Sequence, residues 1–170
     1  DVYKRKIQTT SVNVLVDTGA GSKRLESLKD TFGLNGNKLL KELKKFGITP
    51  RDIDVVVLTH LHFDHSGGCT KLARLGTAIP TFPKAKYLVQ RSSWEEANNP
   101  NERNQPYYHK DVFLPLERDG VIELLDGDAE IIPGVRTKVT HGHARGHQIM
   151  LLEIGSERIA YLADLVPTPY

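Results

Sequence analysis

The chain has 170 residues, 39% apolar and 26% charged, which is typical of one folded domain, here 1–170, with a sizeable core. Its formal charge of +2 comes from scattered Lys and Arg, so we expect no nucleic-acid partner. Apolar runs fall far below the roughly 20 residues that span a bilayer, which excludes a membrane helix. One cysteine, Cys69, excludes an internal disulfide, and nothing at the start resembles a signal peptide, so we expect a cytoplasmic protein.

The first part of the chain predicts alternating strands and helices. A single strand over 2–7 precedes a buried strand over 12–17, "VNVLVD". Leucines at helical spacing predict a helix over 38–46, and "VVVL" at 55–58 predicts the next buried strand. Because strand, helix and strand follow in that order, we expect the strands 12–17 and 55–58 to pair in parallel.

Beyond residue 68 the pattern predicts a short helix, a strand, a second helix and a long irregular segment. These cover, in order, 69–75, 85–90, 93–97 and 98–118. Ser92 or Ser93 is the expected N-cap of the second helix. We expect the long segment to pack over the functional site. From residue 121 onward the sequence predicts short strands with tight turns, at 121–125, 127–131, 135–140, 148–154 and 158–163.

The histidines are concentrated in two short segments. Six of the seven are His60, His62, His65, His141, His143 and His147. Potential metal ligands or their supports directly follow four predicted strands, namely His60 with His62, His141 with His143, Asp164, and Asp17. Because ligands bind outside the strand ends of open α/β sheets, one site at one edge is expected.

The ligand types favour a metal site. A His-x-His pair places two imidazoles on the same side of an extended segment, and a third His completes a set with an open position for water. Asp64 and His65 point elsewhere and could serve a second ion, with Asp164 bridging two ions about 3.5–4 Å apart.

Four motifs carry a resemblance to a known family. "THLHFDHSGG", "THGHARGHQ", "YLADLVPT" and "VDTGAG" resemble, in order, the signature segments of the metallo-β-lactamase superfamily. The resemblance implies an α/β fold of the αββα sandwich type, here without part of its C-terminal region. It also implies two divalent metal ions, zinc first, with manganese, iron or cobalt as alternatives.

The resemblance also implies a role for each site residue. The first metal would be bound by His60, His62 and His143, and the second by Asp64, His65 and a bridging Asp164. Asp17 would tether a histidine ligand, and His147 would be supportive. Two positions depart from the family pattern. His141 stands where the family has proline, so it could be a further hydrogen-bond donor behind the ligands, a contact to substrate or, as we favour, a tolerated surface residue. No histidine after His147 supplies the family's last ligand.

The implied activity is metal-dependent hydrolysis, in which metal-bound hydroxide attacks a carbonyl and Asp64 passes its proton to the leaving group. "LTHLHFDHSGG" and "LLDGDAEIIPGV" are similar to the quorum-quenching N-acyl homoserine lactonase branch. A glyoxalase-II-like thioester hydrolase is the nearest alternative, and a sulfur dioxygenase with one iron is another. A non-catalytic metal-binding or sensing module is the alternative of a different class. The expected partner is a small ester, lactone or thioester, and a homodimer stays open.

Other residues receive structural interpretations. We interpret His109 as a structural histidine and Cys69 as a small buried residue. The aromatic side chains Trp94, Tyr107 and Tyr108 are expected to pack rather than to contact substrate.

Overall fold

The computed structural model describes residues 6–8, 12–34, 36 and 38–168. Its first sheet has the strand order β1-β2-β3-β6-β7, parallel except for β1. The strands are β1 (Lys6–Gln8), β2 (Asn13–Val16), β3 (Val55–Val57), β6 (Lys86–Gln90) and β7 (Ile122–Leu125). The predicted parallel pair is confirmed, with Val16 opposite Val57. The predicted strand over 2–7 lies mostly outside the described residues, and β1 covers its end.

The second sheet is antiparallel, in the order β11-β10-β9-β8. Its strands are β8 (Ala129–Ile132), β9 (Val135–Val139), β10 (Gln148–Ile154) and β11 (Glu157–Tyr161). The strands predicted from residue 121 onward are therefore confirmed to within two residues, although the first of them, β7, joins the other sheet.

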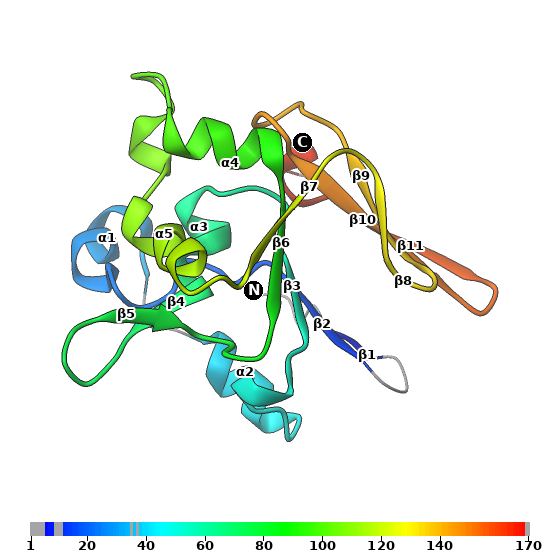
Figure 1. Cartoon of the computed structure of the whole chain (residues 1–170), viewed down its shortest axis with the longest axis horizontal. Helices are drawn as coiled ribbons and strands as arrows, with labels where there is room; N and C mark the ends of the chain where they lie inside the picture. Colours follow the sequence, from blue (N-terminus) through cyan, green and yellow to red (C-terminus); the bar gives the residue numbers. More distant parts are fainter. Residues whose placement is uncertain (1–5, 9–11, 35, 37, 169–170) are drawn as a thin grey trace.

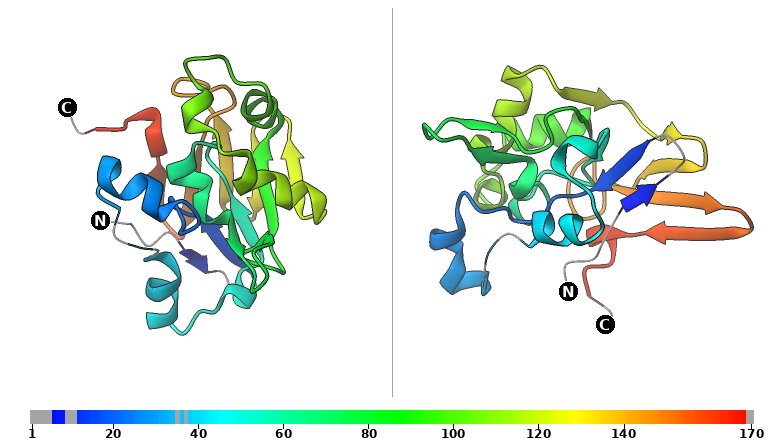
Figure 2. Two further views of the ribbon diagram at one scale, coloured as in Figure 1. Left: turned by 90° about the vertical axis from the view of Figure 1, so that its left-hand side faces the viewer. Right: turned by 90° about the horizontal axis from the view of Figure 1, so that it is seen from below.

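Helices gather on one side of the first sheet, and the second sheet lies on the other side (Figure 1 and Figure 2). The helices are α1 (Leu25–Phe32), α2 (Leu39–Lys45), α3 (Phe63–Ser66), α4 (Arg91–Asn98) and α5 (Lys110–Arg118). Short 3-10 turns are η1 (Pro50–Asp52), η2 (Gly67–Cys69), η3 (Gln105–Tyr107) and η4 (Ala163–Leu165). Since the longest described helix has nine residues, none in the described part of the chain could cross a bilayer.

Two apolar cores hold these layers together. Between the helices and the first sheet lie Leu43, Trp94, Phe113, Val56 and Tyr87, among others. Between the two sheets lie Val14, Val16, Val57, Leu88, Val135, Met150 and Leu152. The described residues thus build a helix layer and two facing sheets, in agreement with the predicted αββα sandwich. The outer face of the second sheet presents charged side chains, including the ion pair Arg136–Glu153.

The predicted helix over 69–75 is wrong. The chain instead forms a hairpin in which β4 (Thr70–Leu72) pairs with β5 (Ala78–Pro80). The β-branched Thr70 favours extended backbone, and its buried hydroxyl donates to the carbonyl oxygen of Val112. Leu72 and Leu75, whose spacing would also fit a helix, are exposed, by 57% and 94%. Their spacing therefore does not mark a buried helix face.

The long segment 98–118 contains more regular structure than predicted, because α5 occupies its second half. Pro115 lies inside this helix and lacks the N–H that would bond to the carbonyl oxygen of Asp111. The Lys23 ammonium donates to that oxygen instead, so the helix continues through the proline.

The predicted N-cap of the helix over 93–97 is also wrong. α4 starts at Arg91, directly after β6, and its N-cap Gln90 makes no capping hydrogen bond with its side chain. Ser92 and Ser93 therefore lie in the first turn. The Gln90 amide is used elsewhere, donating to Gln148 Oε1 at 2.8 Å and pairing with the backbone of Gly127.

The end of the first sheet is joined to the second sheet at the edge where the site lies. The backbone N–H of Gln148, the first residue of β10, donates to the carbonyl oxygen of Thr59 at 3.0 Å. Its side chain donates to the carbonyl oxygen of Leu58 at 2.8 Å. These buried bonds fix the loop after β3 relative to the second sheet.

The loop after β2 packs without a gap on the turn after α3. Thr18 N donates to the carbonyl oxygen of His65 at 2.7 Å, and Gly68 N donates to that of Gly19 at 2.9 Å. A Cβ atom on Gly67 or Gly68 would come closer than 3.0 Å to the backbone of this loop. Glycine is therefore required here by the close approach of two backbones.

We expect Gly67→Ala to lower the free energy of unfolding by about 3 kcal/mol, because backbone cannot yield as a side chain does. Gly76→Ala is the matched control. Its φ of +82° is unfavourable for alanine but no atom lies in the way, so a loss of about 1 kcal/mol is expected. Urea unfolding in the presence of a chelator measures both, and equal losses would show that the close approach carries no cost.

Candidate metal centre

Loops from both sheets bring the predicted site residues together at one edge. His60, His62 and His65 follow β3, His143 lies in the loop between β9 and β10, and Asp164 lies in η4 after β11. Nitrogen and oxygen atoms of these side chains fall into two clusters, His60 with His62 and His143, and His60 with His65 and Asp164. Within each cluster the candidate ligand atoms lie within 4.8 Å of one another.

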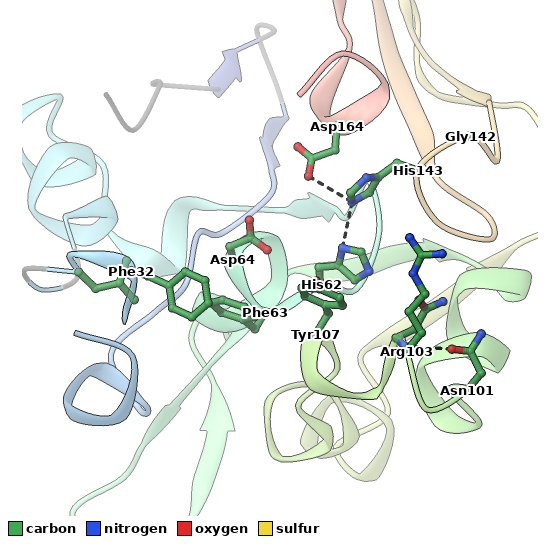
Figure 3. Close-up of a pocket in the computed structure, with 12 residues that line it drawn as sticks. Phe32, His62, Phe63, Asp64, Asn101, Arg103, Tyr107, Gly142, His143 and Asp164 are labelled. Carbon is green, nitrogen blue, oxygen red and sulfur yellow. Dashed lines mark hydrogen bonds and ion pairs between the residues drawn. The ribbon is translucent and has the colours of Figure 1, made fainter. Parts of the chain in front are cut away.

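The first cluster has the donors that a divalent cation needs. His143 Nε2 lies 3.0 Å from His62 Nδ1, with the Asp164 carboxylate beside them (Figure 3). His60 is fully buried, and its Nε2 has no hydrogen-bond partner among the described residues. A buried nitrogen without a partner is costly unless it binds something. The three imidazoles therefore fit a bound cation.

Asp164 belongs to the second cluster and also faces the first. Its Oδ2 is 3.3 Å from His143 Nε2 and 3.9 Å from His60 Nε2, whereas its Oδ1 is 3.2 Å from His65 Nε2. One carboxylate thus faces both sets of histidines, an arrangement compatible with the bridging role expected from the sequence.

Asp17 orients two histidines from the end of β2. Its carboxylate accepts from His65 Nδ1 at 2.8 Å and from the Thr59 hydroxyl at 2.9 Å. Thr59 Oγ1 lies 3.0 Å from His60 Nδ1, and since its own proton goes to Asp17, it accepts from His60. His60 therefore carries hydrogen on Nδ1 and turns an unpartnered Nε2 toward the clusters, as metal-binding histidines do, whereas His65 donates from Nδ1 to Asp17 and turns its Nε2 toward Asp164 Oδ1.

Burial and neighbouring charges set the protonation of the cluster. Burial, and then the other histidines, lower the pKa of His60 well below its usual value. Burial and then His143 lower the pKa of His62 to about 4. His65 behaves differently, because burial is outweighed by its bonds to Asp164 and Asp17, which raise its pKa. His60 and His62 are thus neutral at pH 7 and can donate lone pairs.

The remaining predicted site residues lie around the clusters. Asp64 belongs to neither, and its carboxylate lies 3.7 Å from His65 Nε2 and lines the cleft described below. Desolvation raises the pKa of Asp64, and His65 opposes that shift. His147 is buried and contacts Thr140 Oγ1 through Nδ1 at 2.7 Å, outside both clusters. His141 is exposed, as expected, but its Nδ1 also accepts from Gly146 N at 3.1 Å and closes the loop.

Three strand ends at the site adopt strained backbone. Asp17, His141 and Ala163 have positive φ, of 54°, 56° and 46°, and follow β2, β9 and β11. Such a conformation costs a non-glycine residue about 1–2 kcal/mol. Residues of this kind cluster at functional sites because the strain aims side chains that regular strands would not.

A cleft of about 810 Å³ opens above the clusters (Figure 3). Phe32, Leu34 and Phe63 form an apolar part of its wall. A polar part comes from the segment before η3, namely Asn101, Arg103 and Asn104, with Tyr107 beside His62. The floor is formed by His62, Asp64, His143 and Asp164. The expectation that 98–118 packs over the site is therefore confirmed.

The structural interpretations of other residues mostly agree with the structure. Cys69 is buried, and Trp94 packs against Phe113 at 5.3 Å between ring centroids. His109 stacks on Phe63 at 5.2 Å, away from both clusters. Tyr107 differs, because it is 45% exposed and lines the cleft. The sequence motifs gave no signal for two neighbours of the site, Phe32 on α1 and Glu96 on α4.

Comparison with known proteins places this geometry in a family. The family model described as the metallo-beta-lactamase superfamily matches residues 7–169. An N-acyl homoserine lactonase of Bacillus cereus is 30% identical over 158 residues, and one from a Bacillus species is 33% identical over 162 residues. Each alignment covers 86% of this chain, which spans only 56% of the length of these curated relatives.

Solved structures show the same fold. A probable metal-dependent hydrolase from Staphylococcus aureus superposes with a TM-score of 0.87 at 30% identity, covering 96% of this chain and 58% of that one. A quorum-quenching N-acyl homoserine lactone lactonase superposes with a TM-score of 0.72 at 28% identity, covering 94% of this chain and 59% of that one.

We expect Asp17→Asn to weaken divalent metal binding by about 10–100-fold. Oδ2 of Asp17 accepts from His65 Nδ1 and the Thr59 hydroxyl, and Oδ1 accepts from the Thr59 backbone N–H, so the NH₂ group of an amide must face a donor on one side and disturb the support of the rings. Titration of metal-free protein with Zn²⁺ against a chromophoric chelator measures the affinity. Asp119→Asn, which removes only a surface ion pair with Arg118, is the control. Equal affinities in the two variants would contradict the role of Asp17.

Proposed function

The chain belongs to the metallo-β-lactamase superfamily, and we propose that the protein is a metal-dependent hydrolase that opens the ring of a lactone. The observation that carries the proposal is the convergence of His60, His62 and His143, whose candidate ligand atoms lie within 4.8 Å of one another beside the cleft and include the unpartnered, buried Nε2 of His60. The relatives that are at least 30% identical and carry the name N-acyl homoserine lactonase support the choice of substrate class.

Two divalent ions, zinc in the first place, are proposed as cofactors. His60, His62 and His143 would hold one, and His65 with Asp164 and Asp64 the other. When bound, such ions polarise a carbonyl oxygen and acidify water. Asp164, with one oxygen toward each histidine set, is the residue placed to serve both.

Asp64 is the proposed acid–base residue. Hydrolysis adds water across the ester bond, so the carbonyl carbon gains a hydroxyl group and the ring oxygen gains a proton as the C–O bond breaks. The Asp64 carboxylate lines the cleft and can carry that proton from water to the leaving oxygen. His65 Nε2 lies 3.7 Å from the Asp64 carboxylate and 3.2 Å from Asp164 Oδ1, so this imidazole stands between the two carboxylates.

The cleft suits an amphipathic acyl lactone. The lactone ring would lie over His62 and His143, while Phe32, Leu34 and Phe63 offer an apolar surface to an acyl chain. Asn101, Arg103 and Asn104 offer donors to the amide carbonyl of such a substrate. On this proposal the partner is a small molecule, and a cytoplasmic location and a homodimer stay predictions.

The first test is hydrolysis of N-acyl homoserine lactones by metal-free protein to which zinc, manganese or cobalt is returned. We expect turnover only with metal, and a loss of about 10²-fold or more in Asp64→Asn because proton transfer is removed. The thioester S-lactoylglutathione is the rival substrate. Faster turnover of the thioester than of any lactone would replace the proposed substrate, and metal uptake without turnover of either would support the binding-only alternative.

A second expectation concerns the acyl chain. Phe32 is 52% exposed and lines the cleft, so Phe32→Ala should raise KM for long-chain lactones more than for short-chain ones and leave kcat unchanged. The matched control is Phe46→Ala, because Phe46 is 58% exposed but lies after α2 outside the cleft. Steady-state kinetics with a series of acyl lengths checks this, and a KM increase independent of length would contradict it.

A further inference from the structure

Glu96 on α4 collects three hydrogen bonds from segments that surround the histidines. Its Oε2 accepts from the Tyr108 hydroxyl at 2.8 Å and from the backbone N–H of Arg145 at 2.9 Å. Its Oε1 accepts from Asn104 Nδ2 at 3.1 Å. Asn104 and Tyr108 lie in the segment before α5, and Arg145 lies 49 residues from Glu96, so this single carboxylate joins α4, that segment, and the loop between β9 and β10.

One of these bonds acts on the loop that carries His143. The base of the loop is fixed by Thr140 N donating to the carbonyl oxygen of His147 at 2.8 Å. Its tip is fixed to α4 by the backbone N–H of Arg145, two residues beyond His143, which donates to Glu96 Oε2. The His143 side chain is 28% exposed and its ring packs on the His60 and His62 rings, so the anchored loop backbone sets where this ring lies relative to them.

The bond from Tyr108 acts on His62. The His62 ring lies 5.0 Å from the Tyr108 ring and 5.1 Å from the Tyr107 ring, between centroids. Tyr108 is buried, and burial followed by the bond to Glu96 raises the pKa of its hydroxyl, which therefore stays a donor. Figure 3 shows Tyr107 beside His62 and His143 facing the same ring.

We propose that Glu96 is a positioning residue that sets the spacing between His62 and His143, and through it the affinity of the first metal site. The inference rests on the proposed function, because it assumes that these histidines bind metal. Glu96 touches neither histidine. It acts through Tyr108 on one side and through the loop backbone on the other, where the two imidazole nitrogens approach to 3.0 Å.

The chemistry explains why a carboxylate is needed at this position. All three partners donate, so the residue must offer acceptors on two sides, which an ionised glutamate does. Glutamine keeps an oxygen that can take the place of Oε2 but presents an NH₂ group to Asn104. Alanine keeps none of the bonds. The adjacent Glu95 contacts Arg145 only through an exposed side-chain ion pair at 3.6 Å.

The test compares Glu96→Ala, Glu96→Gln, Tyr108→Phe and the matched control Glu95→Ala. The metal-free form of each protein is titrated with Co²⁺. The affinity for Co²⁺, the visible absorption of the bound ion, which reports coordination geometry, and the melting temperature of the protein are recorded. We expect Glu96→Ala to lose about tenfold in affinity for one ion and to change the spectrum. Glu96→Gln should recover most of that loss, Tyr108→Phe should show part of it, and Glu95→Ala should match wild type.

Each outcome decides a different claim. Equal Co²⁺ affinity and spectrum in Glu96→Ala and Glu95→Ala would overturn the inference. If Glu96→Ala does not fold, a Tyr108→Phe variant with the Co²⁺ affinity and spectrum of wild type would overturn it. Wild-type protein that binds Co²⁺ without hydrolysing lactones would remove the proposed function and leave this inference standing. Wild-type protein that takes up no Co²⁺ would overturn both.

Discussion

The site depends on one buried carboxylate. Asp17 fixes His65 directly and His60 through the Thr59 hydroxyl, so both imidazoles turn their Nε2 atoms toward the clusters. Asp17 can do so because β2 and β3 are parallel neighbours, and its own N–H continues their ladder by donating to the carbonyl oxygen of Val57. The left-handed backbone of Asp17 then turns the carboxylate toward the loop after β3. The parallel pairing of β2 and β3 thereby determines how the His60 and His65 rings are oriented.

Much of this could be predicted from the sequence, because the signal is local. Apolar β-branched runs such as 55–58 identify buried strands, and chemistry-bearing residues directly after such strands must meet at one edge. The convergence of His60, His62, His65, His143 and Asp164 follows from that rule together with the motifs. The αββα architecture followed from the family resemblance rather than from the apolar pattern alone.

What the sequence did not predict depends on contacts distant in the chain. The segment 69–75 has helical leucine spacing, yet Thr70 is held extended by its bond to Val112, 42 residues later. Pro115 predicts the end of a helix, because it leaves the carbonyl oxygen of Asp111 without its helical donor. In the structure Lys23 donates to that oxygen instead. Glu96 looks like any acid on an exposed helix face, because its three donors come from other segments.

The candidate ligands come from both sheets, and this has a thermodynamic consequence. His60 and His62 follow β3 of the first sheet, whereas His143 and Asp164 follow strands of the second sheet, which meets the first through an apolar core and the hydrogen bonds of Gln148. An ion bound by all of them would act as a cross-link between the layers. Since a ligand that binds only the folded state stabilises it, at 1,000 times its dissociation constant by about 4 kcal/mol, unfolding would become coupled to the free metal concentration. Resistance of the protein to denaturation would then report the metal supply of its surroundings.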